Sequence, residues 1–152
     1  MRGIRQGDPL SPFIFVLMME GLGQLINAKI TSHDLKGLTP HGIDRHSHQQ
    51  LVDDTMLMGK ASVQEVRSIN YCLNTFLAAS GLDINKRKSH IYFFNTCHIM
   101  KRNICHILGL YEGTLPSKYL GAPLSDSLLI CLLERSHGSS ESQTLLMDLS
   151  LP

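Results

Sequence analysis

The chain has 152 residues, which is enough to bury one ordinary hydrophobic core, so we expect one domain or part of one. Its 43% hydrophobic and 18% charged residues are typical of a globular protein and exclude a disordered chain. The formal net charge of +1 neither indicates nor excludes a polynucleotide partner, because free-standing nucleic-acid binders usually carry a larger basic excess.

Targeting signals and cysteine spacing bear on the compartment. The longest apolar run, residues 13–19, is far shorter than the roughly 20 residues that cross a bilayer, and the first residues lack the apolar stretch of a signal peptide. The four cysteines show no Cys-x-x-Cys spacing, so we expect free thiols rather than disulfides. We therefore expect an intracellular protein, nuclear or cytoplasmic, with no membrane partner.

The first predicted element is a helix over residues 12–29. Ser11 would cap it, Pro12 suits the first helical position, and apolar residues then recur with a helical period. Residues 31–47 contain two glycines, a proline and three histidines, which is typical of turns.

Residues 50–58 predict a tight β-hairpin with Asp53 and Asp54 at its tip, because two short β-prone arms flank the acidic pair. An ordinary acidic turn is the alternative for these residues taken alone, since aspartate tolerates turn geometry.

A second helix is predicted from Ser62, which forms a capping box with Glu65, to Gly81, which would end the helix in a left-handed conformation. A strand over residues 90–94, a short helix over 100–108, and a turn with a short strand over 115–121 follow. Beyond Leu124 the pattern degrades, and we expect roughly the last fifteen to twenty residues to be poorly ordered.

Four segments, in order, resemble the reverse transcriptases of non-LTR (LINE-type) retrotransposons, especially plant ones. They are residues 2–12 (RGIRQGDPLSP, like the B motif), 51–54 (LVDD, like the C motif), 81–89 (GLDINKRKS, like the D motif) and 119–124 (YLGAPL, like the E motif). One acidic pair alone would be weak evidence, whereas four ordered blocks at plausible spacing are specific.

The resemblance implies an α+β fold, a partial reverse transcriptase palm of helix, β-hairpin, helix and strands, without the fingers and the first palm strand. It covers residues 1–125, and residues 126–152 are expected to be a divergent tail. The implied function is a fragment of an RNA-directed DNA polymerase. Its partners would be an RNA template, a DNA primer and deoxynucleoside triphosphates.

The implied catalytic residues are Asp53, Asp54 and Lys88. In the full-length family enzyme two Mg²⁺ ions stabilise the attacking and leaving oxygens, and Asp53 and Asp54 would be their ligands here. Lys88 would neutralise or protonate the leaving pyrophosphate.

Two further groups of residues are implied by the same resemblance. Arg5, Gln6 and Gly7 would contact the template and the incoming nucleotide. The primer grip would consist of Tyr119, Leu120 and Gly121.

Several departures from the family favour an inactive chain. The A motif, with a further metal-binding aspartate, precedes the B motif in the family and is not among these residues; the missing strand would also leave a sheet edge exposed. Leu51 stands where an aromatic residue is usual.

Alternatives to a polymerase fragment are a non-catalytic remnant, or a module that binds nucleic acid weakly through its basic residues (Arg2, Arg5, Lys86, Arg87 and Lys88). A zinc site at Cys97, His98, Cys105 and His106 is a minor alternative, because the spacing fits no standard finger.

Overall fold

The computed structural model describes residues 7–37, 47–51, 54–125 and 143–151, and these form helices and strands in the mixture that the sequence predicts. The predicted α+β class is therefore confirmed. In chain order the elements are α1 (Ser11–Thr31), β1 (His48–Leu51), β2 (Asp54–Lys60), α2 (Val63–Ser80), β3 (His90–Phe94), α3 (His98–Leu108), β4 (Tyr111–Glu112), β5 (Ser117–Tyr119), β6 (Ala122–Leu124) and β7 (Thr144–Ser150).

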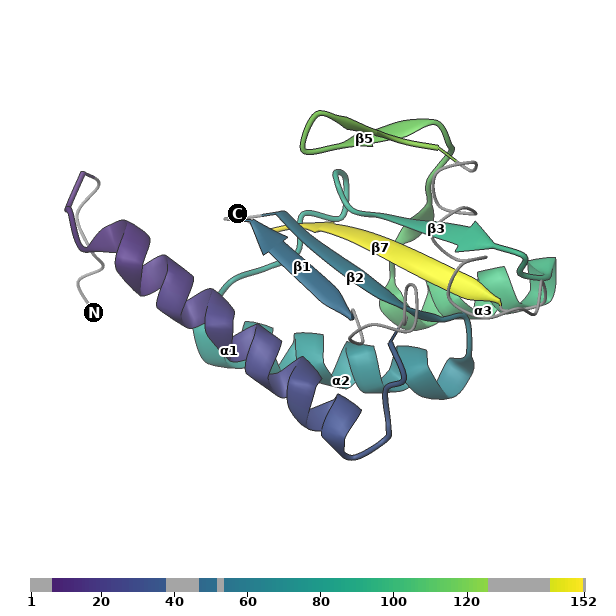
Figure 1. Ribbon diagram of the computed structural model, residues 1–152, viewed down its shortest axis with the longest axis horizontal. Coiled ribbons are helices and arrows are strands. Elements are labelled where there is room, and N and C mark those ends of the chain that lie inside the picture. The colour runs from purple at the N-terminus through teal and green to yellow at the C-terminus, as the bar shows by residue number, and fades with distance from the viewer. Residues whose placement is uncertain (1–6, 38–46, 52–53, 126–142, 152) are drawn as a thin grey trace.

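Five strands form the main sheet in the order β1-β2-β7-β3-β4, so the strand that comes last in sequence lies in the middle (Figure 1). β7 runs antiparallel to both β2 and β3, whereas the short β4 is parallel to β3. The edge that the sequence predicted to be exposed is thus covered, because β7 fills the space beside the hairpin.

The two faces of the sheet are covered differently (Figure 1). Helices α1, α2 and α3 pack on one face, where Leu57, Ile91 and Met147 contribute to a continuous apolar core. The hairpin formed by β5 and β6 lies on the other face, where Tyr119 and Leu124 pack against a smaller apolar cluster. Asp54 and Asp148 lie on this second face, because side chains alternate along a strand.

Local sequence signals explain α2 well. The Ser62 hydroxyl accepts a hydrogen bond from the Glu65 amide at 3.3 Å, and Gly81 ends the helix with a φ of 74°. The cap at Ser62 and the end at Gly81 are confirmed, but the reciprocal half of the predicted capping box is wrong, because the Glu65 carboxylate accepts from the amide of Lys60 rather than from that of Ser62.

The cap predicted for the first helix is wrong. Ser11 is already helical, the N-cap position belongs to Leu10, and no side-chain cap bond forms there. Asp8 organises the turn instead: its carboxylate accepts from the Leu10 amide at 2.9 Å and its carbonyl from the Ser11 amide at 3.1 Å. Pro12 lies in the first turn as predicted, but as the second helical residue rather than the first.

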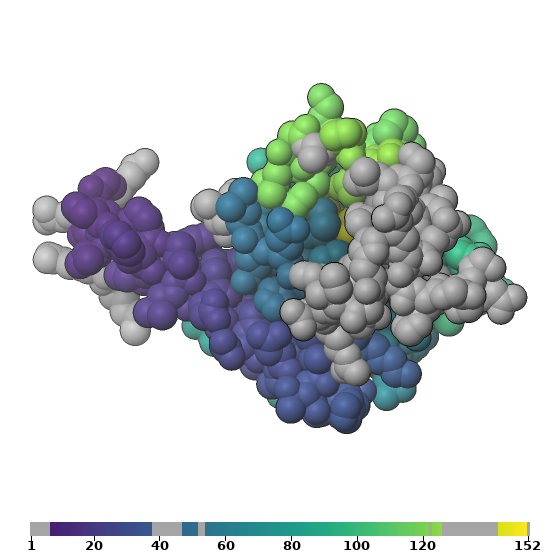
Figure 2. Space-filling view, viewed as in Figure 1, coloured from purple at the N-terminus to yellow at the C-terminus, as the bar shows by residue number. Residues whose placement is uncertain are grey.

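Among the described residues, helix α1 is long and apolar enough to cross a membrane by length and composition alone, a test that core helices of soluble proteins and signal sequences also pass. The expectation of no membrane-spanning segment therefore stays a prediction. Its C-terminal half packs on the protein through Leu22 and Ile26, while its N-terminal half projects away from the body and exposes Phe13 and Leu17 (Figure 2).

The expectation of a poorly ordered tail is wrong for residues 144–150, which form β7. Leu145, Met147 and Leu149 are fully buried against the helices. Residues 126–142 and 152 lie outside the described part of the chain, so the expectation for them stays a prediction.

Candidate active site

The acidic hairpin is formed by β1 and β2, which pair antiparallel with Leu51 opposite Asp54. Asp54 is therefore the first residue of β2, next to the hairpin tip, and its side chain is half-buried. Asp53 lies outside the described residues. The predicted hairpin is confirmed in its arms, and the tip that joins them is not described.

The neighbouring strand β7 adds polar side chains to the same face of the sheet. Ser150 lies directly opposite Asp54, and Asp148 lies opposite Met56 on one side and His90 on the other. Asp148 is thus a diagonal neighbour of Asp54 across the β2–β7 pair.

A turn over residues 85–89 brings Lys88 to the same end of the sheet. The carbonyl of Asn85 accepts from the amides of Lys88 and Ser89, both at 3.0 Å. The turn is tied to the end of β7, because the Ser150 amide donates to the Ser89 hydroxyl at 3.1 Å and the Asn85 amide donates to the Ser150 carbonyl at 3.0 Å. Lys88 therefore has a fixed place beside β7.

The β5–β6 hairpin covers this polar region. Its turn consists of Leu120 and Gly121, both with positive φ (50° and 82°), which is the backbone that a two-residue hairpin turn of type I′ requires. Tyr92 holds the hairpin on the sheet through a 2.9 Å hydrogen bond from its hydroxyl to that of Ser117. The requirement for a positive φ is a structural reason for a glycine at position 121.

Tyr119 points a polar group into buried surroundings. The residue is 8% exposed, and its hydroxyl oxygen has no hydrogen-bond partner among the described residues. Burial, followed by the negative charges of Asp148 and Asp54, raises the pKa of Tyr119 to about 12. The hydroxyl is therefore protonated at neutral pH and lies within electrostatic reach of both carboxylates.

These segments together enclose a pocket of about 300 Å³. It is lined by Asp54, Lys88, Lys118, Tyr119, Leu120, Asp148 and Ser150. Burial, with Asp54 as a secondary cause, raises the pKa of Asp148, and the nearby His90 opposes this shift. The ion pairs of the described residues, Lys29–Asp34 and Lys101–Glu112, both lie elsewhere, so the lysines of the pocket are not paired with its carboxylates.

The pocket combines two carboxylates with two ammonium groups and one phenol. Carboxylate oxygens suit a hard divalent cation, and lysines suit the phosphates that accompany such a cation. Among the described residues no group of three or more His, Cys, Asp or Glu side chains is placed to hold a metal ion. Any cation here would complete its shell with water, the tyrosine hydroxyl or oxygens of a bound phosphate.

The pocket brings together four of the residues predicted from sequence, namely Asp54, Lys88, Tyr119 and Leu120. Gly121 and Gly7 are described but do not line it; Gly7 lies in the turn before α1 with a φ of 88°. The other predicted site residues, Asp53, Arg5 and Gln6, lie outside the described residues.

Sequence reasoning missed Asp148, Ser150 and Lys118. A short signal for the first two was present, because apolar residues alternate with polar ones from Met147 to Leu151, which favours a strand with Asp148 and Ser150 on one face. Lys118 lies directly before Tyr119 on β5, so its closeness to a predicted primer-grip residue was a signal for it.

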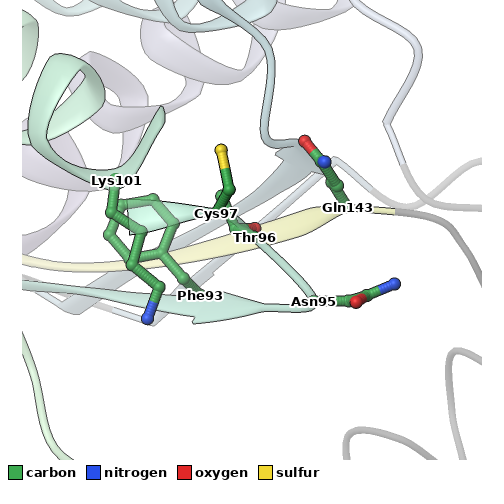
Figure 3. Close-up of a pocket in the computed structure, with 6 residues that line it drawn as sticks. All are labelled: Phe93, Asn95, Thr96, Cys97, Lys101 and Gln143. Atoms are coloured by element: carbon green, nitrogen blue, oxygen red, sulfur yellow. The ribbon is translucent and has the colours of Figure 1, made fainter. Parts of the chain in front are cut away.

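A second hollow lies at the other end of the sheet (Figure 3). Lys101 in its lining stacks on the ring of Phe93 and pairs with Glu112 at 2.6 Å, and the described part of the lining contains no carboxylate. Cys97 is exposed at its rim, at the N-terminus of α3. This hollow offers less chemistry than the Asp54 pocket.

Comparison with known proteins identifies the larger part of the chain. The family model described as reverse transcriptase (RNA-dependent DNA polymerase) matches residues 1–124. No solved structure matches the chain. The match ends at the last residue of β6, so β7 and Asp148 lie outside it.

Proposed function

The chain belongs to the reverse transcriptase (RNA-dependent DNA polymerase) family, and from that premise we propose that the Asp54 pocket is the place where primer end and incoming nucleotide meet. One observation carries the proposal: residues from three separate segments, Asp54, Lys88 and Tyr119, line a single pocket although each was predicted from its own motif. We propose in addition that the parent enzyme is of the non-LTR, LINE type, on the strength of the four ordered motifs.

The residues of the pocket have distinct roles in this proposal. Asp54, with Asp53 at the hairpin tip, would hold Mg²⁺, which when bound stabilises the oxygens that attack and leave in nucleotidyl transfer. Lys88 places a positive charge where a triphosphate would lie. Tyr119 and Leu120, on the β5–β6 hairpin, would position the primer terminus against the acidic side chains.

The oxygen atoms in the pocket are of the kind that Mg²⁺ prefers as ligands. Asp54 contributes anionic oxygen at the start of a strand held on both sides by ladder hydrogen bonds, and the unpartnered Tyr119 hydroxyl marks an unsatisfied polar position beside it. Mg²⁺ commonly binds through one or two carboxylates together with water and substrate phosphates.

We propose that the 152-residue polypeptide binds primer–template but does not extend the primer. Within the family match, the predicted metal-binding carboxylates are Asp54, which lines the pocket, and Asp53, which lies outside the described residues. The further aspartate of the family's A motif is not among the matched motifs. The reaction also needs the template and nucleotide held in line, which is a separate requirement from charge.

Binding is tested by fluorescence anisotropy with a labelled RNA–DNA hybrid at several salt concentrations. Lys88→Gln and Lys118→Gln should each weaken binding and lower the salt slope by about one. Lys36→Gln is the matched control, because Lys36 is exposed and lies outside the pocket. Equal losses in all three variants would contradict the proposal and favour nonspecific attraction to surface charge.

Activity is tested by primer extension on poly(rA)/oligo(dT) with Mg²⁺ or Mn²⁺. We expect no incorporation. Incorporation that disappears in Asp53→Asn or Asp54→Asn would show that the isolated polypeptide is an active polymerase. Failure to bind the hybrid at low salt would instead favour a remnant with neither binding nor activity.

A further inference from the structure

Strand β7 is the part of the molecule that the family resemblance does not explain. It lies outside the matched residues 1–124, yet it occupies the centre of the sheet and brings Asp148 into the Asp54 pocket. We propose that Asp54 and Asp148 together bind one divalent cation, with Asp148 as a ligand supplied by the C-terminal strand.

The strand register gives the two carboxylates a suitable separation. Asp54 lies opposite Ser150, and Asp148 is two residues earlier on β7, so the two side chains share a face as diagonal neighbours. Such neighbours have their α-carbons roughly 7–8 Å apart, which is within reach of side chains that lean toward each other. A Mg²⁺ ion at roughly 2.1 Å from each ligand oxygen would fit between the carboxylates.

The position of Asp148 is rigidly defined. β7 pairs along its length with β2 and along most of it with β3, and Leu149, next to Asp148, is fully buried on the opposite face. The next residue but one, Ser150, is bound through both its amide and its carbonyl to the turn that carries Lys88. A ligand on such a support keeps its geometry when the cation binds.

An independent observation indicates that the pocket takes a ligand. The Tyr119 side chain is more than nine-tenths buried, lines the same pocket, and has a hydroxyl with no partner among the described residues. A buried hydroxyl without a hydrogen bond is costly, and a hydrated cation between the carboxylates would supply one through its water. The negative charges of Asp54 and Asp148 share this pocket without an ion pair to its lysines, and a cation between them would offset their repulsion.

The lysines of the pocket indicate which further ligand would bind together with the cation. Lys88 and Lys118 line the pocket beside the carboxylates, so a cation there would have ammonium groups next to its open coordination positions. Phosphate oxygens can fill the open coordination positions of the cation and accept hydrogen bonds from the ammonium groups. The chemical class that fits is therefore a divalent cation with a nucleoside triphosphate. This choice of phosphate ligand rests on the proposed function, whereas cation binding by Asp54 and Asp148 does not.

The experiment is a titration of the full 152-residue polypeptide with Mn²⁺, followed by the electron paramagnetic resonance of free Mn²⁺, without nucleic acid or nucleotide. The wild-type chain should bind one ion. Asp54→Asn and Asp148→Asn should each weaken binding at least about tenfold, because affinity for hard cations follows the number of charged ligands. Asp83→Asn is the matched control, since Asp83 is exposed and outside the pocket.

Thermal unfolding provides a second measurement. If Asp148 had only a structural role, Asp148→Asn would not change the effect of Mg²⁺ on the melting temperature. With a chelator present, Asp148→Asn should melt at or above the wild-type temperature, because one of two like charges is removed. Added Mg²⁺ should raise the wild-type midpoint and leave that of Asp148→Asn unchanged, since an ion that binds only the folded chain stabilises it.

The outcomes separate this inference from the proposed function. Wild-type Mn²⁺ affinity in Asp148→Asn overturns the inference, even where Asp54→Asn loses the ion, because Asp53 and Asp54 would then suffice. Asp148→Ala is a second variant for the same comparison if Asp148→Asn does not fold. Hybrid binding that depends on Lys88 in a chain without Mn²⁺ binding would refute the cation site and uphold only the nucleic-acid binding of the proposed function.

Discussion

Glu65 shows how a single side chain ties a local signal to the stability of the molecule. The sequence identifies it as the last residue of a capping box, three positions after Ser62, and in the fold it is 5% exposed. Its carboxylate accepts hydrogen bonds from the backbone amides of Lys60 and Lys36. Burial nevertheless raises the pKa of Glu65, because the charged form loses more from dehydration than these bonds return.

This raised pKa predicts how stability depends on pH. The folded state binds the proton more tightly than the unfolded state, so this contribution is fully present below the unfolded pKa and is lost as pH rises through the folded one. Glu65→Gln stays neutral and keeps an acceptor oxygen, so it should be as stable as wild type near pH 4 and more stable near pH 7. Urea unfolding at both pH values measures the difference.

Glu65→Ala provides the contrast, because it removes the acceptor as well as the charge. It should cost about 1–3 kcal/mol at acid pH, where the wild-type carboxyl is neutral. A Gln variant that is less stable than wild type at pH 7 would show that the backbone bonds outweigh dehydration.

The candidate site shows which functional residues sequence motifs can predict and which they cannot. Asp54, Lys88 and Tyr119 were predicted because each belongs to a recognisable motif, and the fold brings all three to one pocket. Asp148 was not predicted, because its contribution depends on a strand pairing more than eighty residues away along the chain. Such pairing depends on tertiary packing that local propensity does not encode.

At the scale of elements, α2 was predictable because its signals agree. The cap at Ser62, one apolar stripe and the glycine at position 81 all indicate the same helix, and the structure confirms both ends. The start of α1 was predicted less well, since Ser11 and Asp8 both have the chemistry of a cap and only the folded chain shows that Asp8 forms the bonds.

The end of α2 yields a test of backbone conformation. Gly81 has a φ of 74°, and a methyl group at its α-carbon would meet no atom within 4 Å. Gly81→Ala should therefore destabilise the chain by about 1–2 kcal/mol through backbone strain alone. Denaturant unfolding monitored by circular dichroism measures the change.

Gly21 provides a control with the same chemical change and the opposite expected sign. It lies inside α1, where an added methyl group also meets nothing within 4 Å. Gly21→Ala should stabilise the chain by roughly 0.5–1 kcal/mol, because alanine loses less conformational entropy in a helix. Destabilisation by both substitutions would refute the conformational explanation for Gly81.

At the scale of the whole molecule, the sheet joins strands inside the family match to one strand outside it. Residues 1–124 match the reverse transcriptase family, whereas β7 lies outside the match and forms the middle strand. Without β7 the hairpin strand β2 and the strand β3 would have no partner between them, and the main apolar core would lose Leu145, Met147 and Leu149. The matched region therefore depends on the C-terminal segment for its sheet.

This dependence predicts that shortening one buried side chain of β7 destabilises the entire fold. Leu149 is 0% exposed and packs in the main core, so Leu149→Ala should cost about 2–5 kcal/mol and lower the midpoint of the one cooperative transition. Leu17→Ala makes the same chemical change at a position that is 74% exposed, and it should alter stability by less than about 0.5 kcal/mol. Equal, small effects of the two substitutions would mean that β7 is an accessory strand, and a separate low-temperature transition in Leu149→Ala would mean that it unfolds independently of the helices.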